Sequence, residues 1–199
     1  MSKPFELTPD QRGGMDKLLV WLETAKGGDI FRFYGEAGCG KTSCSIEIKN
    51  LKLKNGDWVN PLYLAFTNRA VSILRGKGCW PCSTVHSVLY DVGEYEVEET
   101  PEDIKVRQKY LDAVMRGVPP SERPPAPKSN TEIGFGLRDE ISLMDKIRGH
   151  RCVVVDEASM IGERMGGDLR QLNLPIVAVG DPGQLKPVGD EPMFDPRDP

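Results

Sequence analysis

One octapeptide limits the folds open to this chain more than any other segment. Gly35–Thr42 reads GEAGCGKT and fits the spacing G-x-x-x-x-G-K-[ST]. The apolar stretch IFRFY precedes it, and helix-compatible residues follow from Lys41 to about Lys54. Glycines at these positions let backbone N–H groups close around phosphate oxygens, and the next helix adds partial positive charge. We therefore expect a phosphate-binding loop rather than a glycine-rich turn with a solvent lysine.

Short apolar stretches alternate with helical ones along most of the chain. A first helix is predicted after Thr8, an N-cap residue followed by Pro9 at the first helical position and Gln11 at the capping-box position. Alternating strands and helices predict an α/β fold, a parallel sheet with helices on both faces. The expected strands begin at residues 30, 61, 152 and 175, and further helices are expected over 41–54, 68–76 and within 83–90.

Residues 91–140 differ from the rest in composition. The segment begins with acidic residues, continues with the helical stretch IKVRQKYLDAVMRG and then becomes proline-rich. Such a segment predicts an inserted subdomain or a flexible excursion outside the sheet. The main domain is then formed by residues 1–90 and 141–199.

The stretch VVVDEASM is the second candidate for chemistry. An apolar strand here delivers Asp156 and Glu157 at its carboxyl end, where ligands bind in open α/β sheets. Lys41 can reach the β- and γ-phosphates of a nucleotide, and Thr42 and Asp156 can hold Mg²⁺. Glu157 can polarise an attacking water. The alternative for the two acids is an ordinary solvated strand end.

Bulk composition points to a globular chain without membrane segments. Hydrophobic residues make up 39% and charged residues 28%, and no apolar run nears the roughly 18 residues of a membrane span. Five cysteines without a regular framework fit free thiols in a reducing compartment, so we expect a cytoplasmic protein. The formal net charge of −4 gives no sign of a strongly basic nucleic-acid binder.

The ordered set LTPDQ, GEAGCGKT, AFTNRA, STVHS, DEASM and GDPGQLKPV resembles the superfamily-one DNA helicases of the RecD-like and Dda-like branch, which move 5′ to 3′ on single-stranded DNA. The resemblance implies a RecA-like P-loop NTPase fold and an ATP-dependent DNA helicase of a bacterial or phage-infected cell. It also implies ATP and Mg²⁺ as cofactors, with single-stranded and fork DNA as partners. Segment 91–140, outside the resemblance, stands where relatives insert a strand-separating pin.

The resemblance also assigns roles within the nucleotide site. Gln11 would read the adenine edge, although helix capping explains it equally well. Asp181 and Gln184 would sense the γ-phosphate, and an ordinary Asp-Pro-Gly turn is the alternative for that segment. Catalysis is expected from Lys41, Asp156, Glu157 and Gln184. Nucleotide binding is expected from Gln11, Gly35, Glu36, Ala37, Gly38, Cys39, Gly40, Lys41, Thr42 and Ser43.

Two further motifs are implied to contact the DNA backbone. The residues concerned carry hydroxyl, amide or cationic groups, the usual partners of phosphate. Relatives often carry proline at Phe66 and lysine at Arg69, so the local geometry of AFTNRA stays open. They also often carry proline at Lys186, where the lysine either adds a phosphate contact or is exposed to solvent. The expected DNA-binding residues are Thr67, Asn68, Arg69, Thr84 and His86.

Other functions compete with a helicase. Cys79 and Cys82 form a C-x-x-C pair, but a zinc site would need two more ligands and packing explains the pair as well. A P-loop kinase would leave GDPGQL unexplained. We expect the second RecA-like domain of a helicase, with its arginine finger, to be absent, so that the isolated chain hydrolyses ATP very slowly without a partner protein. A non-catalytic, nucleotide-dependent DNA-binding module acting with a partner is the alternative.

Overall fold

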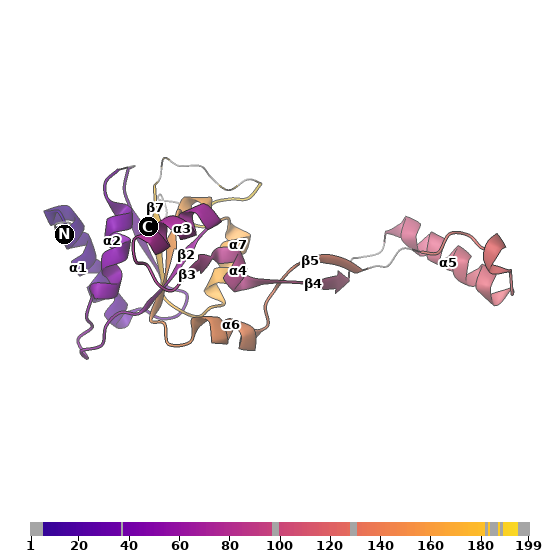
Figure 1. Cartoon of the computed structure of the whole chain (residues 1–199), viewed down its shortest axis with the longest axis horizontal. Coiled ribbons are helices and arrows are strands. Elements are labelled where there is room, and N and C mark those ends of the chain that lie inside the picture. Colours follow the sequence, from indigo (N-terminus) through magenta and orange to yellow (C-terminus); the bar gives the residue numbers. More distant parts are fainter. Residues whose placement is uncertain are drawn as a thin grey trace. The chain divides into compact units, whose positions relative to one another are not determined.

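The chain forms two compact units. A computed structural model describes residues 6–36, 38–96, 100–127, 131–181, 183, 187 and 189–194. The first unit comprises Met1–Leu89 and Arg138–Pro199, and the second is Tyr90–Leu137 (Figure 1). The inserted segment was expected over residues 91–140, and the second unit ends before residue 140. Asp139 already caps helix α6 (Glu140–Ile147), because its side chain accepts a hydrogen bond from the backbone N–H of Ser142. That helix belongs to the first unit.

A five-stranded parallel sheet organises the first unit. Its strands lie in the order β1, β7, β6, β2 and β3, and all neighbouring pairs are parallel. The predicted α/β fold with a parallel sheet is thereby confirmed. Strand β3 was not expected, because a three-residue strand is too short to show an alternating pattern. The bounds are β1 Ile30–Tyr34, β2 Pro61–Ala65, β3 Cys82–Thr84, β6 Cys152–Asp156 and β7 Ile176–Gly180.

Helices connect these strands and flank the sheet. The capping box between Thr8 and Gln11 starts α1, as predicted. Helix α2 is shorter than the predicted 41–54, because the chain turns back in a loop in which Leu53 N–H donates to Asp57 O at 2.8 Å. The other bounds are α1 Pro9–Thr24, α2 Lys41–Glu47 with a 3₁₀ turn Ile48–Asn50, α3 Asn68–Gly76, α4 Val85–Leu89, a 3₁₀ turn Ala158–Met160 and α7 Glu163–Arg170.

Both faces of the sheet are buried. Helices α1, α2 and α3 share one apolar cluster with Tyr63, Val154 and Val179, which are at most 1% exposed. Successive side chains of a strand point to opposite faces, so Leu64 and Val155 face the other side, and both are fully buried. Continuous apolar strands of this kind are typical of parallel sheets covered on both sides.

The second unit consists of a hairpin, a helix and a short 3₁₀ turn. Strands β4 (Tyr90–Glu96) and β5 (Thr131–Leu137) are antiparallel, with Val92 opposite Phe135. Helix α5 (Pro101–Met115) and the 3₁₀ turn Pro120–Glu122 lie between these strands in sequence. Across the described residues of both units, every helix is too short or too polar to cross a bilayer.

Candidate active site

The predicted phosphate-binding loop joins β1 to α2. Gly38 and Gly40 have φ angles of +83° and +86°, in the left-handed region that glycine adopts without steric cost. A Cβ atom on Gly35 would lie 2.5 Å from the Cys39 sulfur, so the loop also closes tightly on itself. The backbone path therefore favours glycine at Gly38 and Gly40, and the close approach of the Cys39 side chain favours it at Gly35.

The ammonium group of Lys41 lies inside this loop. Its Nζ donates hydrogen bonds to Gly35 O at 2.6 Å and to Glu36 O at 2.7 Å. It also lies 3.7 Å from Asp181 Oδ2, and the two side chains are 13% and 9% exposed. Asp181 directly follows β7, the strand beside β1, and its Oδ1 accepts from Gly183 N–H at 2.9 Å. Lys41 thus links the loop to the end of the neighbouring strand.

The two acids of DEASM lie at the carboxyl end of β6. Burial raises the pKa of Asp156 above its usual value. A hydrogen bond from the Glu157 backbone lowers that pKa, the Glu157 charge raises it, and the ammonium groups of Lys77 and Lys41 lower it. Glu157 has a φ of +56°, in the left-handed region that is uncommon for such a residue and is often found at functional sites.

A cavity of about 310 Å³ brings these elements together. Lys41 and Thr42 line it from the loop, and Asp156 and Glu157 line it from β6. Oxygen ligands such as the Thr42 hydroxyl and the Asp156 carboxylate suit Mg²⁺, so the residues fit the expected metal. The complete lining is Gly38, Gly40, Lys41, Thr42, Ser43, Lys77, Asp156, Glu157 and Gly180.

This geometry agrees with a sequence comparison. The family model described as AAA domain matches residues 7–196. The chain belongs to the AAA domain family. Members of this P-loop family, which is also found in superfamily-one helicases, generally bind and hydrolyse nucleotides with Mg²⁺. Comparison with curated proteins gave no match.

Gln11 packs against the phosphate-binding loop of this AAA domain. Its Oε1 accepts from Thr8 N–H at 2.9 Å in the capping box, and its Nε2 donates to Cys39 O at 2.8 Å. A Cβ atom on Gly40 would lie 2.4 Å from that nitrogen. Helix capping is therefore present, and the same side chain also touches the loop.

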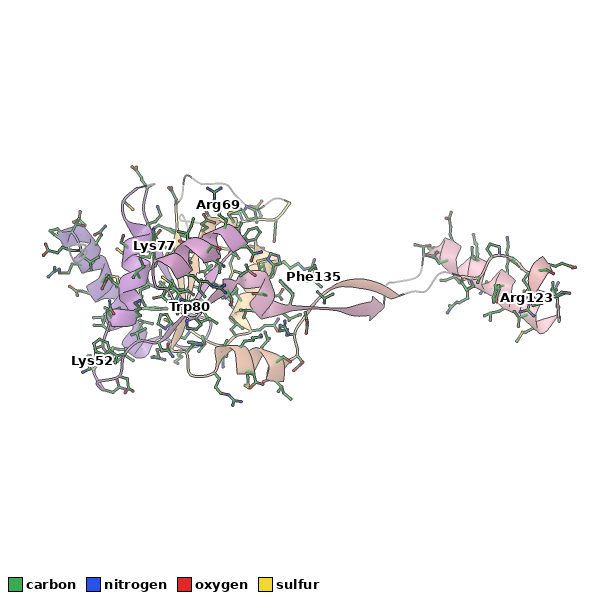
Figure 2. The ribbon with its side chains drawn as sticks, in the orientation of Figure 1. Lys52, Arg69, Lys77, Trp80, Arg123 and Phe135 are labelled. Atoms are coloured by element: carbon green, nitrogen blue, oxygen red, sulfur yellow. The ribbon has the colours of Figure 1, made fainter. Side chains whose placement is uncertain are left out.

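The residues expected to contact DNA lie around the carboxyl ends of β2 and β3. Thr67 caps α3, its hydroxyl oxygen accepting from Ala70 N–H at 3.1 Å, and Arg69 is exposed on the first turn (Figure 2). Ala65 pairs with Thr84, which brings the ends of the two strands together. The His86 ring meets the Phe66 ring edge-on, with centroids 5.5 Å apart. Asn68, like Arg69 and His86, is exposed.

The C-x-x-C pair belongs to the core. Cys79 is fully buried and Cys82 is 1% exposed, and burial raises the pKa of each thiol to about 11. A reactive or metal-binding cysteine needs an accessible thiolate. In the described part of the chain, no three His, Cys, Asp or Glu residues gather as a metal site. Packing therefore explains this pair.

Some predictions cannot be compared with the structure, and one residue was missed. Ala37, Gln184 and Lys186 lie outside the described residues. Lys77 lines the cavity but was not predicted, because it lies 35 residues beyond the phosphate-binding loop in no recognisable motif. Only the packing of α3 beside α2 brings it to the site.

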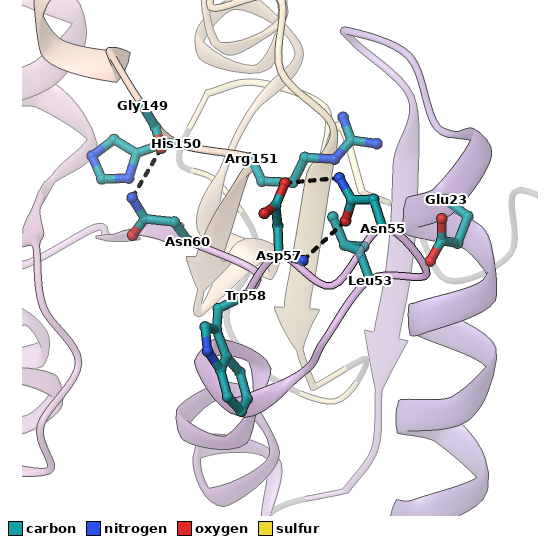
Figure 3. Close-up of a pocket in the computed structure, with 9 residues that line it drawn as sticks. All are labelled: Glu23, Leu53, Asn55, Asp57, Trp58, Asn60, Gly149, His150 and Arg151. Carbon is teal, nitrogen blue, oxygen red and sulfur yellow. Dashed lines mark hydrogen bonds between the residues drawn. The ribbon is translucent and has the colours of Figure 1, made fainter.

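A second cavity, of about 590 Å³, lies at the amino ends of the strands of the sheet (Figure 3). Asn60 and Arg151, which line it, precede the amino ends of β2 and β6. Several of its polar groups bind one another, as in the 2.7 Å hydrogen bond from Asn55 to Asp57. Ligands of open parallel sheets bind at the carboxyl ends, so the site beside Lys41 is the candidate active site.

Proposed function

We propose that this AAA domain is the ATP-binding and single-stranded-DNA-binding part of an ATP-dependent DNA helicase or translocase. The observation that carries the proposal is the single cavity in which the GEAGCGKT loop meets Asp156 and Glu157. The ordered motifs before and after this cavity favour a DNA motor over other P-loop enzymes.

Nucleotide binding follows from the loop. The phosphates would be held by loop N–H groups and by Lys41, with Gln11 at the adenine end. Thr42 and Asp156 would hold Mg²⁺, which neutralises phosphate charge during hydrolysis. Glu157 would accept a proton from the attacking water and orient it. Phosphoryl transfer is catalysed mainly by such positioning and charge stabilisation.

Asp181 gives the site a means of sensing the terminal phosphate. Its carboxylate lies 3.7 Å from Lys41 Nζ, so it competes with phosphate for the same cation. Binding and loss of the phosphate would change this pairing and move the segment that begins at Asp181. Gln184, in that segment, would take part in the same response.

DNA binding is proposed at the ends of β2 and β3. Thr67, Asn68 and Arg69 begin α3, and Thr84 and His86 lie beside the paired end of β3. Hydroxyl, amide and cationic groups are suited to backbone phosphates, so binding would be largely independent of base sequence. Substitution Arg69→Ala should weaken single-stranded DNA binding and lower its salt dependence. Arg148→Ala, at the exposed residue directly after α6, is the control.

The hairpin of the second unit is proposed to separate strands at a fork. Phe135 is 73% exposed and stands opposite Val92, which is 59% exposed. An exposed aromatic side chain such as Phe135 can stack against an unpaired base. Substitution Phe135→Ala should slow unwinding by the complete enzyme and leave its ATPase activity intact. Equal unwinding rates would remove the hairpin from the proposal.

ATP binding and hydrolysis, measured with and without single-stranded DNA, test the central claim. Lys41→Ala should abolish tight ATP binding, because it removes the cation at the loop. Glu157→Gln should retain ATP but stop turnover, because the amide cannot accept the water's proton. Lys54→Ala, a lysine outside the cavity, is the control. ATP affinity unchanged by Lys41→Ala would refute the site. ATP-dependent DNA binding with no turnover, even when a partner that supplies the second RecA-like domain is added, would favour the non-catalytic module.

A further inference from the structure

We propose that Lys77 is a second phosphate-binding cation of the nucleotide site and contacts the terminal phosphate of the bound nucleoside triphosphate. The inference rests on the proposed nucleotide binding at the cavity beside Lys41. It assigns to this site a residue that lies in none of the motifs read from the sequence.

The backbone around Lys77 is fixed at the end of α3. The Lys77 N–H donates to Ile73 O at 3.2 Å and to Leu74 O at 3.1 Å. Gly78 follows with a φ of +83°, the left-handed conformation that commonly ends a helix. Gly78 O accepts from Lys49 Nζ at 2.6 Å, which ties this end of α3 to the turn after α2.

From that anchored position the Lys77 side chain lines the cavity. It shares the lining with Thr42 and Ser43 from the first turn of α2 and with Asp156 from β6. Lys77 is exposed, so its side chain can approach a bound ligand without being drawn out of the protein core. Figure 2 labels Arg69 on α3 and Lys77 directly after the end of that helix.

The cavity lining places Lys77 at the phosphate end of the cavity. The adenine end is marked by Gln11, whose side chain touches Cys39 O. Lys77 instead lines the cavity together with Thr42 from α2 and Asp156 from β6. Thr42 and Asp156 would hold Mg²⁺, which would offset the charge of the outer phosphates. Lys77 therefore lines the side of the cavity where the terminal phosphate is expected.

The charge balance of the cavity gives Lys77 a role. Lys41 already lies beside Asp181, and two further carboxylates, Asp156 and Glu157, face the cavity. A triphosphate brings more negative charge to this region. A second ammonium group can offset it through a charge-assisted hydrogen bond, which is roughly twice as strong as a neutral one. Because a diphosphate lacks the terminal group, this contact discriminates ATP from ADP.

A different role for Lys77 predicts different behaviour. If Lys77 served only as the counter-ion of Asp156, its removal would affect ATP and ADP alike through the shared metal ligand. A structural role would lower stability and leave the ratio of the two affinities unchanged. The ratio of ATP to ADP affinity therefore separates these roles.

The experiment compares four forms of the full chain by isothermal titration with MgATP and MgADP: Glu157→Gln alone, and Glu157→Gln combined with Lys77→Ala, Lys77→Arg or Lys54→Ala. The Glu157→Gln background prevents turnover. We expect Lys77→Ala to weaken ATP binding about tenfold, equal to about 1.4 kcal/mol, and ADP binding less than twofold. Lys77→Arg should retain most of the ATP preference, and Lys54→Ala should match the background.

Each result decides the inference. Equal losses for ATP and ADP, or no loss, would overturn the assignment of Lys77 while leaving the proposed function intact. Failure of the Glu157→Gln form itself to bind either nucleotide would refute the proposed function, and the Lys77 assignment with it. Circular dichroism of each variant shows whether a loss comes from unfolding.

Discussion

The contact between Gln11 and the phosphate-binding loop can be measured by substituting Gly40 with Ala. Gly40 has a φ of +86°, and a left-handed conformation costs a residue with a Cβ about 1–2 kcal/mol. The new Cβ would lie 2.4 Å from Gln11 Nε2 and would displace the 2.8 Å hydrogen bond to Cys39 O, worth about 1 kcal/mol. We expect a total loss of about 2–3 kcal/mol, or roughly 5–10 °C in Tm.

A double-mutant cycle isolates the part of this loss that comes from Gln11. Gln11→Ala alone should cost about 2 kcal/mol, from the capping box and the same hydrogen bond. Since the Gln11–Cys39 bond can be lost only once, the double variant should be about 1 kcal/mol more stable than the sum of the single losses predicts. Urea denaturation measures all three free energies of unfolding.

Gly38 provides the matched control. Its φ is +83°, but a Cβ atom there meets nothing within 4 Å. Gly38→Ala should therefore cost only the backbone term of about 1–2 kcal/mol and should add to Gln11→Ala without coupling. If the Gly40 and Gly38 cycles were equally additive, Gln11 would not lie against the loop, and its proposed place beside the adenine would lose its support.

Three further substitutions or reactions test other parts of the structure. Tyr63→Phe removes a buried hydrogen bond from Tyr63 Oη to Ser45 O at 3.0 Å and should cost about 1 kcal/mol in urea denaturation; an unchanged midpoint would contradict this contact. Asp156→Asn should raise the Tm of the nucleotide-free chain at neutral pH, because burial raises the folded-state pKa of Asp156 above its usual value of 3.8 and the ionised form therefore costs stability. That gain should disappear as the pH falls below 3.8, where Asp156 is protonated in both states; a gain that persists there would contradict the assignment. Cys39 is the one exposed thiol among the five cysteines, so a thiol reagent should modify one group in the native protein and all five after unfolding.

Local sequence predicted a large part of this fold. The Thr8–Gln11 capping box, helix α3 over Asn68–Gly76 and the strands that begin at residues 30, 61, 152 and 176 carry strong local signals: capping residues, helical periodicity and continuous apolar runs. Weaker signals were missed. Strand β3 has three residues, and helix α7 contains two glycines that disfavour a helix, yet both form because the surrounding core buries Cys82 and Leu169.

The sequence alone determined the chemistry of the phosphate-binding loop. The spacing of GEAGCGKT requires glycines where the backbone is left-handed and a lysine at the start of a helix, and both are local properties of consecutive residues. Tertiary structure decided which distant groups join that loop. Asp156 arrives because parallel strands end at one edge, and Asp181 because β7 lies beside β1. Gln11 on α1 and Lys77 directly after α3 arrive because these two helices pack on the same face as α2, a long-range contact that no local pattern encodes.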